Sequence, residues 1–175
     1  MNTLEAIYSR KSVRSFNAPL TDDELAVILK SAYAAPIGRA MYQNVHLTVI
    51  TNKELLQKIN KNAIDFFKNP DMNPLYDAPM YILVSAKLNS PADNVGFSNC
   101  ATIVENMALA ATELGIGICH IWGATIGLSH NPELVAQLGL PEGFVPCCGA
   151  ILGHTAEVYT EREIPENRIA TAYIK

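Results

Sequence analysis

The chain has 175 residues, of which 49% are hydrophobic and only 17% are charged, with a formal net charge of −4. This acidic balance disfavours nucleic acid and anionic membranes as partners, and no apolar run approaches the ~20 residues needed to cross a bilayer. We therefore expect one cytoplasmic domain over residues 1–175 with reduced thiols, since we read neither a signal peptide nor C-x-x-C spacing. The charged share lies below the ~25% of average domains, which favours a homodimer that buries part of the surface.

Three helix starts in the first third of the chain share the spacing of a capping box. Residues 2–5 (NTLE), 21–24 (TDDE) and 51–54 (TNKE) each begin with a side chain that can accept the third helical N–H. They predict helices at these points, with Thr51 as the cap of the third, which ends before Asn69-Pro70.

Apolar patterns predict the remaining elements. Residues 45–50 alternate as in a strand, and the unbroken apolar run 80–86 is typical of a central strand covered on both faces. Residues 99–114 predict a long helix, apolar nearly all round and therefore suited to a subunit interface, with Gly115 following its end.

The last third of the chain predicts strands over 118–122 and 145–152, with a short helix from Asn131-Pro132 to Gly139 between them. Helices and strands do not strictly alternate, so we expect an α+β fold. Residues 155–175 carry few helix signals. They fit an extended arm that adds a strand to a partner's sheet, or else a loosely ordered tail.

The segment Arg10 to Phe16 (RKSVRSF) holds the most informative chemistry. Arg10, Lys11 and Arg14 place three cations beside the hydroxyl of Ser12 in an otherwise acidic chain. The planar fork of arginine is well suited to phosphate, so the segment fits an anionic cofactor. A charged surface turn is the alternative.

Other familiar motifs are missing. Gly115-x-Gly117 follows a helix, and His120 stands where a third glycine would be needed, which argues against a dinucleotide fold. Cys119 and His120 are neighbours on a strand and point to opposite faces, so they cannot form a catalytic dyad. Cys147 and Cys148 are interpreted as small buried hydrophobes. We expect no metal site.

Four segments together resemble the nitroreductase family, in the same order along the chain. They are the basic segment 10–16, residues 34–50 (AAPIGRAMYQNVHLTVI), residues 99–123 (NCATIVENMALAATELGIGICHIWG) and residues 140–154 (LPEGFVPCCGAILGH) followed by Arg168. The resemblance spans nearly the whole chain. It implies a nitroreductase-like α+β homodimer, with a mostly antiparallel sheet flanked by helices and a C-terminal arm exchanged with the partner subunit.

The resemblance also implies a site for FMN lined by both subunits. Arg10 and Arg168 would hold the phosphate, and Lys11 and Ser12 would lie near phosphate or ribityl oxygens. Arg14 would lie beside the pyrimidine side of the ring, where a cation stabilises the charge that hydride uptake creates. The residues expected along the ring are His120, Ile121, Trp122 and Gly123. Those expected from the other subunit are Pro36, Ile37, Gly38 and Gln43.

The implied activity is an FMN-dependent oxidoreductase that takes hydride from NADH or NADPH. It would pass the hydride by a ping-pong mechanism to small electron-poor acceptors such as nitroaromatics, quinones or flavins, with no side chain as obligatory acid or base. The loop from Ile37 to Asn44 departs from the family pattern, and Glu166 stands where some relatives have a basic residue. This departure motivates an alternative, a flavin-binding redox partner or sensor without efficient nicotinamide turnover.

Overall fold

A computed structural model describes all residues, 1–175, and shows a four-stranded antiparallel sheet. The strands are β1 (Val45–Ile50), β2 (Met80–Lys87), β3 (Gly117–Ile121) and β4 (Phe144–Gly153). Their order across the sheet is β1-β2-β4-β3, with every pair antiparallel. Residues 80–86 of β2 are buried, which confirms the prediction of a central strand.

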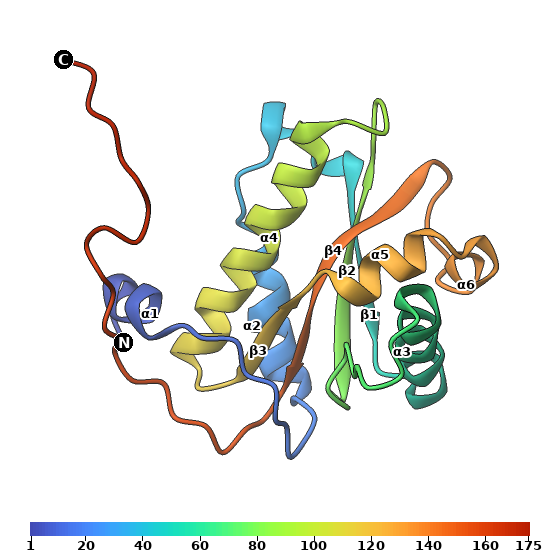
Figure 1. Cartoon of the computed structure of the whole chain (residues 1–175), viewed down its shortest axis with the longest axis horizontal. Helices are drawn as coiled ribbons and strands as arrows, with labels where there is room; N and C mark the ends of the chain where they lie inside the picture. The colour runs from blue at the N-terminus through green and yellow to red at the C-terminus, as the bar shows by residue number, and fades with distance from the viewer.

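Helices cover both faces of the sheet (Figure 1). The helices α2 (Asp22–Tyr33) and α4 (Asn94–Glu113) pack on one face, and α1 (Thr3–Ser9) lies against α4. The helices α3 (Lys53–Phe67), α5 (Gly123–Ser129) and α6 (Pro132–Ala136) pack on the other face. Two apolar cores therefore sandwich the sheet, as expected for an α+β fold.

The capping boxes predicted for the first two helices are confirmed. The side chains of Asn2 and Thr21 accept hydrogen bonds from the backbone N–H groups of Glu5 and Glu24. In turn, the carboxylate of each glutamate accepts the backbone N–H of its capping residue. The third prediction was wrong by one residue. Asn52, not Thr51, caps α3, because its Oδ1 accepts the N–H of Leu55 at 2.9 Å.

Two helical predictions in the second half need correction, and a third helix was not predicted. Helix α4 begins at Asn94 rather than near Asn99, because Asp93 accepts two N–H groups of its first turn. Helix α6 ends at Ala136, before Gly139, whose φ is +62°. Helix α5 was not predicted, because its sequence GATIGLS combines glycines with β-branched residues and has no capping side chain.

A β-bulge interrupts the pairing of β2 with β4. Val84 pairs with Cys148 and Ser85 with Pro146, which leaves Cys147 as the extra residue. Cys147 and Cys148 consequently both pack towards the α4 core, where Cys100 lies. Cys147 is buried as predicted, whereas Cys148 is only half-buried, and all of these thiols are free.

Residues 155–175 contain no helix or strand and run past α1 (Figure 1). Arg162 attaches this arm to the end of α1, where its Nε donates to the carbonyl oxygen of Tyr8 at 2.9 Å and its Nη2 to that of Ile7 at 3.3 Å. A cation at this position complements the negative end of the helix. No helix of the structure is both long and apolar enough to span a membrane.

Candidate functional site

The basic segment leaves α1 at Arg10 and runs alongside β3. The N–H of Val13 donates to the carbonyl oxygen of Ile118 at 2.9 Å, and the Val13 side chain is fully buried. This anchor fixes the residues on either side of it. Arg10, Lys11 and Ser12 are half-buried, with Arg10 next to α4 and Lys11 next to the arm, whereas Arg14 is exposed.

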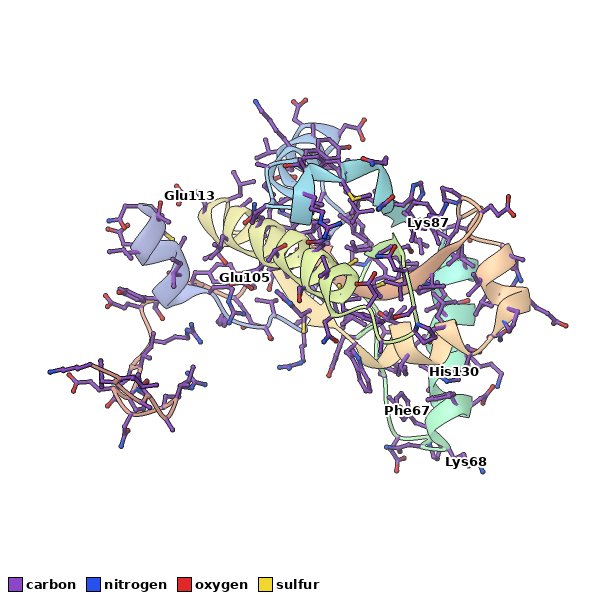
Figure 2. The ribbon with its side chains drawn as sticks, turned by 90° about the horizontal axis from the view of Figure 1, so that it is seen from above. Phe67, Lys68, Lys87, Glu105, Glu113 and His130 are labelled. Carbon is purple, nitrogen blue, oxygen red and sulfur yellow. The ribbon has the colours of Figure 1, made fainter.

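Glu105 joins the basic segment to the end of β3. One carboxylate oxygen lies 3.4 Å from Nε of Arg10, and the other lies 3.1 Å from Nε2 of His120. The contact with His120, followed by the charges of Arg10 and Arg162, holds the pKa of Glu105 below its ordinary value. Figure 2 shows Glu105 on α4, towards α1. Because the carboxylate engages Nε of Arg10, it leaves the two terminal nitrogens of the guanidinium available to another anion.

Lys11 has a carboxylate partner of its own from the arm. Its Nζ lies 2.8 Å from Oε2 of Glu157 and 6.0 Å from the ring centre of Tyr159. The Tyr159 hydroxyl donates to the carbonyl oxygen of Ile116 at 2.8 Å, and burial raises the pKa of Tyr159 to about 12. The start of the arm is thus fixed over the basic segment.

The end of β3 presents exposed groups next to this cationic region. Ile121 is buried, whereas His120 is exposed and the side chain of Trp122, the single tryptophan of the chain, is 64% exposed. A Cβ placed on Gly123 would meet only Cε2 of Phe67, at 3.8 Å. The backbone is therefore open to close approach by a flat ligand.

Phe67 is the aromatic side chain next to Gly123, and two further aromatic contacts involve residues of the basic segment and of α3. The guanidinium carbon of Arg14 lies 5.5 Å from the ring centre of Tyr76, a cation–π arrangement. Phe67 lies at the end of α3 and His130 just after α5, both labelled in Figure 2. Phe66 contacts both, with ring-centre distances of 5.0 Å to Phe67 and 4.8 Å to His130.

The loop that contains Pro36, Ile37, Gly38 and Gln43 lies elsewhere in the same chain. It packs on the first half of α4, where the N–H of Gly38 donates to Oδ1 of Asn99 at 3.0 Å. About 9 Å of helix rise separates Asn99 from Glu105. Ile37 is buried, whereas Pro36, Gly38 and Gln43 are exposed. A single chain does not bring this loop to Arg10, and the contribution from a second subunit stays a prediction.

Arg168 lies on the exposed arm, and its backbone N–H donates to the carbonyl oxygen of Pro165. Its guanidinium makes no hydrogen bond or ion pair within the chain. The expected convergence of Arg168 with Arg10 on one phosphate therefore stays a prediction. The arm arginine that does reach the basic region is Arg162, which lies close enough to influence Glu105.

The sequence interpretation missed Glu105, Glu157 and Arg162. A usable signal existed for Glu105, because it is an isolated acid in the middle of an Ala-rich, mostly apolar helix. Such a charge requires a partner when the helix packs against neighbours. Glu157 and Arg162 carried no comparable signal, since charged residues are common in an irregular tail.

Comparison with known proteins agrees with the fold. Residues 7–154 match the model of the Nitroreductase family, and the chain belongs to that family. A protein of Methanothermobacter thermautotrophicus, provisionally named NADH dehydrogenase/NAD(P)H nitroreductase, is 30% identical, with 90% of this chain and 79% of the relative covered. The NADPH-flavin oxidoreductase of Vibrio harveyi is 27% identical, with 87% and 65% covered.

A solved structure extends the comparison to three dimensions. The crystal structure of a nitroreductase with bound FMN from Bacteroides fragilis superposes with a TM-score of 0.82 at 28% sequence identity. The superposition covers 99% of this chain and all of that chain. The nitroreductase-like fold inferred from the sequence is thereby confirmed.

The donor set of the site suits a flavin mononucleotide. Arg10, Lys11 and the hydroxyl of Ser12 provide cations and a donor for a phosphate. The open backbone at Gly123 and the exposed Trp122 leave space for a flat aromatic ring. These two regions are linked through Glu105 and His120, so they can serve one elongated ligand.

Proposed function

We propose that the chain is an FMN-dependent oxidoreductase that takes hydride from NADH or NADPH and passes it to a small electron-poor acceptor. The observation that carries the proposal is the contact of Glu105 with both Arg10 and His120, which places the phosphate-binding candidates beside the end of β3. The relative named an NADPH-flavin oxidoreductase and the FMN-bound structure support this chemistry. FMN, when bound, supplies a carrier that accepts two electrons from the nicotinamide and gives them to the acceptor.

The residues of the chain would bind and polarise the cofactor. Arg10, Lys11 and Arg168 would neutralise the phosphate, and Arg14, held against Tyr76, would place a fixed cation near the pyrimidine side of the ring. Because Gly123 has no side chain, the flavin ring would be able to approach the backbone there. The exposed surface at Trp122 leaves room for nicotinamide and acceptor to bind in turn, as a ping-pong mechanism requires.

A second subunit would complete this site. Strand β1 is at the edge of the sheet, beside a cavity of about 570 Å3 lined mainly by apolar side chains from α2, β1 and the loop between them, with Ile103 from α4. The arm carries exposed Ile169 and Tyr173, which lie four residues apart and would share one face of an added strand. We propose that the arm of one subunit pairs with the sheet of the other, and that residues 36–43 of each subunit reach the flavin of its partner.

The test of function is a titration read by the single tryptophan. FMN added to the purified protein should quench the emission of Trp122, and NADH or NADPH added without oxygen should then bleach the visible absorbance of the bound flavin. Light scattering should give the mass of a dimer. A protein that binds no FMN, or binds it and is reduced by neither nicotinamide, contradicts the enzyme assignment.

A flavin-binding sensor is the second candidate, and the loop beside the partner's site favours it. Arg39 and Ala40 adopt left-handed backbone conformations with φ of 59° and 55°, unusual for residues other than glycine. Such a loop could restrict nicotinamide access. Bound FMN that dithionite reduces, but that neither nicotinamide reduces, would identify the sensor.

A further inference from the structure

We propose that Glu157 lowers the affinity of the site for FMN by competing with the phosphate for Lys11. The inference rests on the proposed function, because it assumes that Lys11 serves the phosphate. Its consequence concerns specificity. Glu157 would reduce the preference of the site for a phosphorylated flavin over riboflavin, which has no phosphate.

The carboxylate of Glu157 already occupies the position that an anion would take. It lies 2.8 Å from Nζ of Lys11, a typical distance for a charge-assisted hydrogen bond. The contact is not a chance encounter of two mobile side chains, because the backbone on either side of Glu157 is fixed. The N–H of Glu157 donates to Oγ1 of Thr155 at 3.1 Å, and two residues later Tyr159 bonds to Ile116.

Glu157 differs in this respect from Glu105, the other acid in the region. Glu105 is shared between Arg10 and His120 and leaves the terminal nitrogens of Arg10 free. Glu157 has Lys11 as its single ion-pair partner. When a phosphate dianion approaches Lys11, it must either displace this carboxylate or bind beside it against like-charge repulsion. Either route weakens binding.

A pair of matched variants tests the competition. Glu157→Gln keeps the size and polarity of the side chain and removes its charge. Glu161→Gln makes the same change in net charge on the same arm, at an exposed residue without an ion-pair partner. Dissociation constants for FMN and for riboflavin are measured by quenching of Trp122 emission, at low and at high salt.

We expect Glu157→Gln to bind FMN about three- to tenfold more tightly than the unmodified protein. The variant frees Lys11 from a partly exposed ion pair and removes the repulsion between the Glu157 carboxylate and the phosphate. Riboflavin affinity should not change, and Glu161→Gln should match the unmodified protein within about twofold. The gain should shrink at high salt. In a Lys11→Gln background, Glu157→Gln should give no gain.

Several results would overturn the inference while leaving the function intact. These are FMN binding by Glu157→Gln that equals that of Glu161→Gln, weaker FMN binding, or an equal gain for riboflavin. Weaker binding would show that Glu157 positions Lys11 for the phosphate. If none of the proteins binds FMN, the proposed function fails, and the inference fails with it.

Discussion

The hydroxyl oxygen of Tyr81 on β2 lies 2.6 Å from Oγ1 of Thr125 on α5, and both side chains are buried. Thr125 donates its own proton to the carbonyl oxygen of Ile121 at 3.1 Å, so Tyr81 is the donor in the pair. Burial raises the pKa of Tyr81, which keeps this donor protonated. The pair fixes α5 to the centre of the sheet, directly after the segment that presents Trp122 and Gly123.

Removing the Thr125 hydroxyl should lower the free energy of unfolding more than removing the Tyr81 hydroxyl. Thr125→Val leaves the Tyr81 hydroxyl buried without an acceptor and should lower the free energy of unfolding by about 1–3 kcal/mol. Tyr81→Phe leaves Thr125 bonded to Ile121 and should cost only about 0.5–1.5 kcal/mol. Urea unfolding at one protein concentration measures both. A larger loss in Tyr81→Phe than in Thr125→Val would contradict the assigned direction of the hydrogen bond.

Stability should depend on acid pH through Glu105. Its pKa is lowered in the folded chain, so its ion pairs stabilise the protein above the ordinary pKa of 4.5, and this contribution disappears as the pH falls through the lowered value. The free energy of unfolding of Glu105→Gln should therefore lie below that of the unmodified protein at pH 7, and the difference should shrink as the pH falls below the ordinary pKa of 4.5. Glu161→Gln is the control, and an unchanged difference across this range would exclude the ion pairs as its cause.

Gly123→Ala should weaken flavin binding without lowering the stability of the unliganded protein. A Cβ at this position meets only Phe67, at 3.8 Å, so the unliganded protein should keep its melting temperature. A flavin packed on the backbone would meet the added methyl group, and overpacking of about 1–3 kcal/mol would weaken FMN binding by about 5- to 150-fold. Riboflavin should be affected to the same extent. Unchanged affinity for both flavins would show that the ring does not approach Gly123.

The start of α3 offers a test of the corrected cap. Asn52→Ala removes the acceptor of the Leu55 N–H and should cost about 0.5–2 kcal/mol of unfolding free energy. Thr51→Ala removes no capping bond and should stay within about 0.5 kcal/mol of the unmodified protein. The same urea titration compares the two. A greater loss in Thr51→Ala would restore the capping box first expected there.

Local patterns predicted most of the fold because they act within a few residues. The unbroken apolar run at Met80 and the caps at Asn2 and Thr21 needed no information from the rest of the chain. Asn52 and Thr51 are both good capping residues, and only the geometry of the first turn selects between them. Helix α5 depends on packing against α3 and on the bond between Thr125 and Tyr81, so its local sequence did not reveal it.

Some residues of the candidate site could likewise be identified from the sequence, and others only from the folded chain. Arg10 and Lys11 were identified because they are adjacent in the sequence and chemically distinctive. Their carboxylate partners Glu105 and Glu157 come from a helix and an arm that only the folded chain brings to them. The resemblance to known relatives could place the cations, but it contained no information on which acids would neutralise them.

The attachment of Arg162 to the end of α1 makes the exposed arm a point of vulnerability. The side chain of Val158, between the anchored residues Glu157 and Tyr159, is exposed and accessible to a protease. A cut between Val158 and Arg162 would release the guanidinium from the carbonyls of Tyr8 and Ile7 and fray the helix that leads into Arg10. Cleavage within the arm would therefore destabilise helix α1 at the opposite end of the sequence.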